Sequence, residues 1–117
     1  MFTIVESIRN VRGIPQEEID RIKVYLQGAV YAWCNSEKKH EVFYARDFLG
    51  GVNNDWNTTP VQVLYDYYRN VMHRNHDYAH REAGKAAGRL LKIVLNEDER
   101  QFEIHNGRVK GYKWTGR

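Results

Sequence analysis

The sequence has a single cysteine, two prolines and no long apolar run. Because Cys34 has no second cysteine with which to form an internal disulfide, we expect a reducing compartment and a cytoplasmic protein. No stretch approaches the roughly 18 apolar residues of a membrane-spanning helix. Residues 1–13, MFTIVESIRNVRG, also lack the apolar run of a signal peptide. These absences predict a protein without a membrane partner.

The composition is that of a folded chain. Hydrophobic residues make up 42% and aromatic residues 13% of the 117 residues, enough to bury a core without covalent cross-links. Repeats and linker-like stretches are lacking, so we expect a single domain over 1–117 with an N-terminal arm at 1–13. The net charge of +3 is uneven, because residues 73–117 carry 10 basic against 6 acidic side chains and residues 1–72 carry 8 against 9. A basic C-terminal part favours a polyanionic partner.

Three segments have the apolar periodicity of amphipathic helices. The first covers 14–36 and begins at Pro15, which suits a first helical turn. The second covers 60–72 and begins at Pro60 for the same reason, and the third covers 77–95. The predicted inner stripes are Ile19, Ile22, Leu26, Val30 and Trp33; then Val61, Leu64, Tyr65, Tyr68 and Met72; and then Ala79, Ala83, Ala86, Leu90 and Val94.

The C-terminal sequence predicts a β-hairpin. Asn106-Gly107 is the strongest signal for a two-residue turn, in which both central residues take positive φ. Such a turn places Ile104 opposite Val109 in the ladder.

Strict alternation from a two-residue turn has one consequence for the second strand. It places Tyr112 and Trp114 on the opposite face from the apolar side chains of the first strand. A bulge at Gly111 would restore the phase and turn both aromatic side chains inward. We therefore predict a bulged hairpin with two aromatic residues that anchor it to the core.

Together these elements predict an α+β, mostly helical fold with three main helices and a C-terminal hairpin. The segment 41–50, EVFYARDFLG, fits a short strand or a single helical turn. Two predicted helices and the hairpin follow one another in the segments TPVQVLYDYYRNVM, YAHREAGKAAGRLLKIVL and RQFEIHNGRVKGYKW. This order resembles that of a winged helix-turn-helix domain, of the small DNA-binding type of phages and mobile elements. The resemblance covers about residues 40–117. The connector HRNHD is longer than the usual tight turn, which leaves the crossing angle of the two helices open.

The resemblance implies a non-enzymatic nucleic-acid-binding module, with duplex DNA as the partner. In such domains the second helix enters the major groove and the hairpin grips phosphate. The expected contact residues are Arg81, Lys85, Arg89 and Lys92 on the helix and Arg108, Lys110 and Lys113 on the hairpin. Each set alone also fits an ordinary solvated surface or a charged edge strand, so the argument depends on the two occurring together.

Two glycines, Gly84 and Gly88, lie on the same predicted stripe as these helical cations. Each glycine lowers the stability of a helix by about 1 kcal/mol relative to alanine, so we considered what favours glycine at these positions. Close approach of a nucleic-acid groove is one explanation, and close packing of another helix is the other. The second explanation suggests an alternative function, in which the Ala/Gly face docks on a protein partner or on a second copy of the chain.

A less favoured alternative is a metal-dependent hydrolase. His73, His76, Asp77 and His80 would share one face if the helix were continuous, and such a set could bind a transition metal. The structural interpretation is that these residues form a polar connector in which Asn75 or Asp77 caps the next helix. We expect no cofactor and no active site, with Cys34 a buried structural thiol.

Aromatic residues outside the predicted core are candidates for ligand or partner contacts. Trp56 and Tyr67 are the two that we expect to be at least partly exposed.

Overall fold

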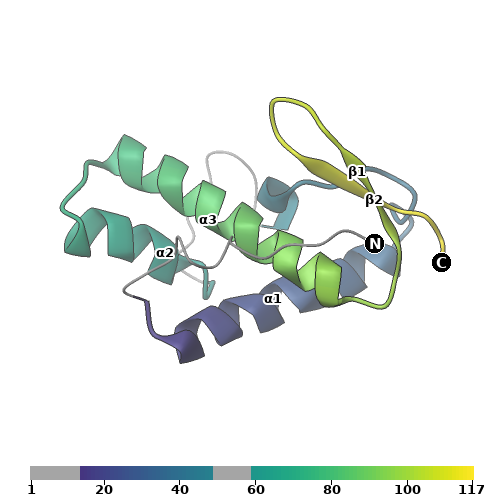
Figure 1. The fold of residues 1–117 in the computed structure, drawn as a ribbon, viewed down its shortest axis with the longest axis horizontal. Coiled ribbons are helices and arrows are strands. Elements are labelled where there is room, and N and C mark those ends of the chain that lie inside the picture. The colour runs from purple at the N-terminus through teal and green to yellow at the C-terminus, as the bar shows by residue number, and fades with distance from the viewer. Residues whose placement is uncertain (1–13, 49–58) are drawn as a thin grey trace.

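The computed structural model describes residues 14–48 and 59–117, so the predicted arm at 1–13 and Trp56 lie outside the described residues. The fold is α+β and mostly helical, with three helices and a C-terminal antiparallel hairpin, as predicted (Figure 1). In chain order the elements are α1 (Gln16–Cys34), the 3-10 helix η2 (Ala45–Phe48), α2 (Gln62–Asp66), the π-helix η3 (Tyr67–Val71), α3 (His76–Glu97), β1 (Phe102–His105) and β2 (Gly111–Trp114).

The longest helix, α3, organises the core. In Figure 1, α1 and α2 lie below it and the loop of the hairpin rises above it. The predicted inner stripe of α3 is entirely buried, and Ala87, Leu91 and Leu95 widen it. The predicted stripe of α1 is also correct, except that Cys34 completes it and Trp33 is only partly buried. Cys34 is 2% exposed, and burial raises the pKa of its thiol, as expected for a structural cysteine.

The second helix departs from the prediction in its last turn. The N–H of Met72 donates to the carbonyl of Tyr67 at 3.0 Å, five residues back, as in a π-helix. The wider turn takes Met72 off the buried stripe and leaves it 42% exposed, so its assignment to the core was wrong. Tyr67 is partly exposed, as predicted.

The helix α3 starts with a side-chain cap. The Oδ1 of Asn75 accepts a hydrogen bond from the N–H of Tyr78 at 2.8 Å, which satisfies one of the free amides of the first turn. The connector 73–75 is not helical. Within residues 14–48 and 59–117, no helix combines the length and the apolar character needed to cross a membrane.

The hairpin has a longer loop than the sequence predicted. Ile104 lies opposite Tyr112, and residues 106–110 form the loop. Neither Asn106 nor Gly107 takes positive φ, so the two-residue turn was wrong. Because five loop residues replace two, the phase of β2 shifts by an odd number and no bulge is needed. Tyr112 and Trp114 still pack on the core, as predicted, but for this different reason.

A third extended segment lies on the other side of β2. Phe43 forms an isolated antiparallel bridge with Tyr112, and their N–H groups donate to each other's carbonyls at 2.7 and 2.9 Å. A Cβ at Gly111 would lie 2.7 Å from side-chain atoms of both Val42 and Tyr44, so the absence of a side chain permits this close approach. The segment 41–50 thus supplies both an extended residue and, in η2, a helical turn.

We expect Tyr112 to make the fold sensitive to alkali. Burial raises its pKa from 10.0 to about 12, so the unfolded state loses the phenolic proton first. The resulting stability is complete below pH 10 and is lost as the pH rises to about 12, a total of about 3 kcal/mol. Tyr112→Phe should flatten the decline of unfolding free energy between pH 9.5 and 11.5, measured by urea titration at about half-unit steps. An unchanged slope would show that other groups, such as Cys34 and Tyr68, cause the decline.

Candidate nucleic-acid interface

The outer face of α3 carries the predicted cations and both glycines. Arg81 and Lys85 are exposed, and Lys92 lies partly buried on the same side of the helix. No described atom outside the local helix backbone lies within 4 Å of the position that a Cβ would take at Gly84 or Gly88. Close packing of another helix within residues 14–48 and 59–117 therefore does not explain these glycines. Within these described residues, nothing packs against the helix at either glycine.

Arg89 lies at the edge of this face. It is partly buried and near Tyr68, whose pKa is raised by burial while the charge of Arg89 opposes the rise. Arg89 therefore lies near η3.

Glu82 offsets part of the positive charge on α3. Its Oε2 lies 3.2 Å from Nζ of Lys85 and 3.8 Å from Nε of Arg81. Both cations remain more than half exposed, so each pair contributes little to stability, about 0–1 kcal/mol. Both side chains could therefore leave Glu82 and pair with a polyanion at only a small loss of stability.

The hairpin loop presents a second set of cations. Arg108 and Lys110 are exposed within the loop, and Lys113 is partly buried on β2, opposite Glu103 in the ladder. Among the described residues none of these three cations has an ion-pair partner within 4.0 Å. Their charge is therefore available to an anionic ligand.

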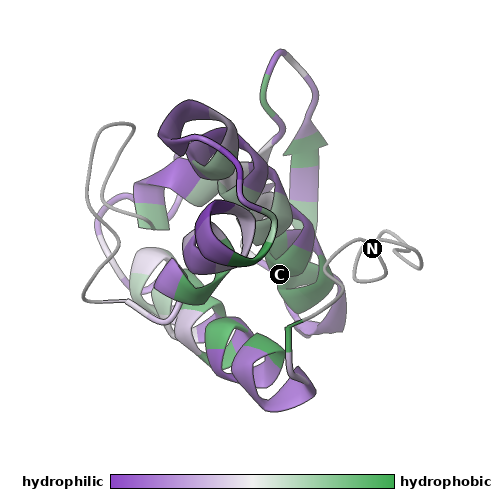
Figure 2. Cartoon of the chain, turned by 90° about the vertical axis from the view of Figure 1, so that its left-hand side faces the viewer, coloured by the Kyte–Doolittle hydropathy of each residue, from purple (hydrophilic) through white to green (hydrophobic). Residues whose placement is uncertain are grey.

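The hairpin loop lies on the side of α3 that faces away from α1 and α2. Both views place the tip of the hairpin above α3, on the side away from α1 and α2 (Figures 1 and 2). In Figure 2 the hairpin loop is mostly hydrophilic, although it includes the exposed Val109. Since the buried stripe of α3 packs toward α1 and α2, the exposed Arg81 and Lys85 face the same general side of the molecule as the hairpin loop.

The histidine-rich connector does not form the predicted constellation. His73 precedes α3 and has a left-handed φ of 56°, so it cannot share a helical face with His76 and His80. Among the described residues no group of three or more His, Cys, Asp or Glu side chains could hold a metal ion. His76 instead contacts Tyr65, with 2.7 Å between Nδ1 and the phenolic oxygen, and its ring lies 5.8 Å from that of His80.

The predicted Ala/Gly docking face of the third helix is only partly accessible. Ala79, Ala83 and Ala86 are fully buried in the core, so only the glycines of the predicted Ala/Gly face are accessible. A partner could not use the alanines without unfolding the domain.

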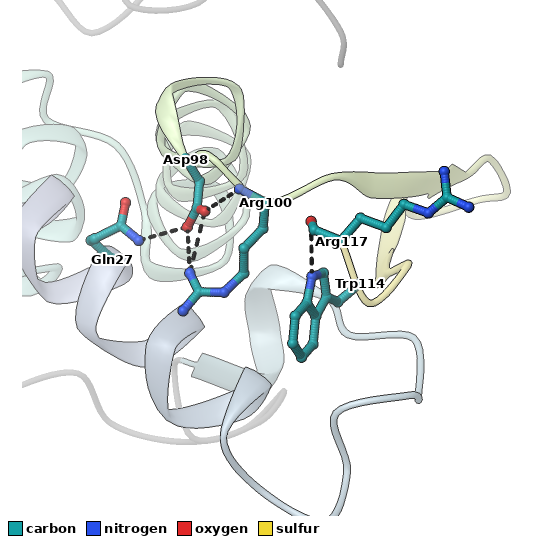
Figure 3. Close-up of polar contacts among 5 residues, drawn as sticks. All are labelled: Gln27, Asp98, Arg100, Trp114 and Arg117. Atoms are coloured by element: carbon teal, nitrogen blue, oxygen red, sulfur yellow. Dashed lines mark hydrogen bonds and ion pairs between the residues drawn. The ribbon is translucent and has the colours of Figure 1, made fainter.

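A polar network fixes the base of the hairpin (Figure 3). Asp98 is 7% exposed, and its carboxylate accepts from Nε2 of Gln27 at 2.8 Å, from the N–H of Arg100 at 2.8 Å and from Nη1 of Arg100 at 3.0 Å. The guanidinium of Arg100 lies 4.5 Å from the ring centroid of Tyr31 and 5.8 Å from that of Trp114. These contacts join α1, the turn after α3 and β2, so they set the direction of the hairpin relative to α3.

The sequence pattern singled out Arg81 but not its neighbours Arg69 and Arg74, which lie beside the start of α3. Arg74 and Arg81 place their guanidinium carbons 4.9 and 5.5 Å from the ring centroid of Tyr78. Arg69 donates from Nη1 to the carbonyl of Arg74 at 3.1 Å. The only available signal was the density of arginine around the connector, because the stacking depends on the turn at His73.

Comparison of the chain with protein-family models, with curated proteins and with solved structures finds no match.

Proposed function

We propose that this chain is a nucleic-acid-binding module that holds duplex DNA against the outer face of α3 and the loop of the hairpin. The observation that carries the proposal is the pairing of two independent basic surfaces on one side of the molecule. One is a helix face with Arg81, Lys85 and two glycines, and the other is a loop whose cations have no ion-pair partner among the described residues. A single solvated helix or edge strand does not account for both.

The dimensions of the helix face suit a major groove. From Arg81 to Lys92 the stripe extends about 16 Å along the helix, at 1.5 Å per residue. This length matches about five base pairs at 3.4 Å each. The groove is about 12 Å wide and admits one α-helix, and bare glycines let the helix backbone approach the base edges.

The connectivity also supports the proposal. The order helix, extended segment, helix, helix, hairpin is that of the winged helix-turn-helix resemblance, and the bridge from Phe43 to Tyr112 joins the extended segment to the hairpin. A hairpin fixed in this way beside α3 can contact phosphates that flank the groove.

The direct test is the affinity for random duplex DNA, single-stranded DNA and duplex RNA across a salt series. We expect tightest binding to duplex DNA, with a steep linear fall of log affinity against log salt. Lys110→Ala should weaken binding to all duplex sequences about equally and reduce the magnitude of the slope by about 1. Lys39→Ala, an exposed cation in the turn after α1, is the matched control and should change little. Absence of duplex binding, or binding insensitive to salt, would overturn the proposal.

The glycines allow a second arm of the same test. Gly88→Ala has room for its methyl group and should raise the free energy of unfolding by about 0.5–1 kcal/mol, because alanine favours the helix. The same methyl group should weaken duplex binding if a groove approaches the helix there. Gly28→Ala is the matched control, since Gly28 is an exposed residue of α1 with equally open space. Equal binding by the two variants would exclude a groove contact at Gly88.

A further inference from the structure

The chain between η3 and α3 is held in a defined turn. His73 adopts the left-handed region, and the N–H of Arg74 donates to the carbonyl of Tyr68 at 3.1 Å. Asn75 then caps α3 through the N–H of Tyr78. These bonds fix the backbone on both sides of Arg74, so its side chain starts from a constrained position beside the first turn of α3.

Two guanidinium groups pack on one aromatic ring at this turn. The distances from the ring centroid of Tyr78, 4.9 Å for Arg74 and 5.5 Å for Arg81, lie within the range of cation–π contacts. A guanidinium held against a ring keeps N–H donors along its edge. Tyr78 therefore restrains the guanidinium groups of both arginines in the free protein, which lowers the conformational entropy lost when a ligand binds.

We name Arg69, Arg74 and Arg81 the arginine cluster. All three are exposed. In the described parts of the chain, neither Arg69 nor Arg74 has a carboxylate within 4.0 Å, and Arg81 has only Glu82 at 3.8 Å. Asp77 is exposed in the first turn of α3 and forms no ion pair with any described residue. Most of the positive charge of the cluster is therefore not compensated by a nearby carboxylate of the described residues.

We infer that the arginine cluster binds a phosphate group of a nucleic-acid backbone. Guanidinium forks pair with phosphate oxygens through two parallel hydrogen bonds, which gives geometric selectivity beyond simple charge. Because the ring of Tyr78 already contacts Arg74 and Arg81, its role is to position these arginines. The inference rests on the proposed function and extends its helix contacts, which already include Arg81, to Arg69 and Arg74. The cluster and the hairpin loop lie toward opposite ends of α3 (Figure 1), so together they would fix the direction of the helix across the groove.

Arg74 provides the sharpest test, since it belongs to neither set of cations already assigned to the interface. Arg74→Ala should weaken binding to random duplex DNA about 5- to 10-fold near physiological salt and reduce the magnitude of the salt slope by about 1. Arg74→Lys keeps the charge but loses the planar fork, and it should still weaken binding about threefold. The matched control is Arg21→Ala, an exposed arginine on α1, which should leave affinity unchanged. Thermal unfolding of each variant checks that the fold is intact.

A separate readout distinguishes failure of this inference from failure of the proposed function. The wild-type chain is titrated with inorganic pyrophosphate, and the Nε–Hε signals of Arg74 and Arg81 are followed by NMR. If the chain binds duplex DNA but Arg74→Ala behaves like Arg21→Ala, or Arg74→Lys like wild type, the inference is overturned and the proposed function stands. If the chain binds no duplex but pyrophosphate shifts both arginine signals, the proposed function falls and the cluster remains a phosphate site. If neither ligand binds, both are wrong.

Discussion

Phe43→Ala is expected to lower the free energy of unfolding by about 4 kcal/mol, the largest loss that we expect from any single truncation. Phe43 is fully buried, and its ring lies 5.2–6.0 Å from those of Trp33, Phe48, Phe102 and Tyr112. Truncation would remove the shared centre of this aromatic cluster and leave a cavity between α1 and the hairpin. Because the backbone bridge to Tyr112 depends on the same residue, the amide of Tyr112 should also exchange faster with solvent.

Urea unfolding followed by circular dichroism measures the first effect, and hydrogen exchange measures the second. Phe43→Leu is the matched control, because it keeps most of the apolar volume and should cost about 1 kcal/mol. A loss below about 1.5 kcal/mol for Phe43→Ala would mean that the segment around Phe43 does not close the core. Unchanged exchange at Tyr112 would mean that the bridge contributes nothing to the hairpin.

Arg100→Ala is expected to lower the free energy of unfolding by about 3 kcal/mol, a large effect for an arginine. The side chain of Asp98 is only 3% exposed, so removal of the guanidinium leaves a buried carboxylate without its counter-charge. The stacking of Arg100 on Tyr31 and Trp114 is lost as well. The hairpin should then lose its fixed direction, so the DNA affinity that we propose should fall although Arg100 is not among the residues assigned to that interface.

The double variant Asp98→Asn with Arg100→Met separates these causes. Removal of both charges should recover most of the stability, because asparagine can still accept the hydrogen bond from the N–H at position 100. Arg21→Ala, which breaks only the exposed pair with Glu18, should cost at most about 0.5 kcal/mol. If Arg100→Ala is no more destabilising than Arg21→Ala, the carboxylate of Asp98 gains nothing from its ion pair.

The helices were predictable because their information is local. Apolar residues three and four apart defined the buried faces of α1 and α3, and the same spacing placed Arg81 and Lys85 on the opposite side. In the second helix Tyr65 is only partly buried and Met72 is exposed, and the error at Met72 arose because a π-helical turn leaves no clear mark in an apolar pattern.

The errors arose where distant residues decide the local structure. Asn106-Gly107 has the sequence of a tight turn, yet the burial of Tyr112 and its bridge to Phe43 select a longer loop. No short-range pattern could reveal that pairing. The stacking of Arg74 on Tyr78 was equally hidden, because it depends on a left-handed residue that is not a glycine.

Gly111 has a consequence for how this sequence can vary. Since any Cβ at position 111 would meet Val42 and Tyr44 at 2.7 Å, the three positions share one small volume. A larger residue at 111 can be accommodated only if position 42 or 44 becomes smaller or its side chain moves. Substitutions at these positions should therefore be correlated among related chains, and that covariation would identify relatives whose overall similarity is too low to detect.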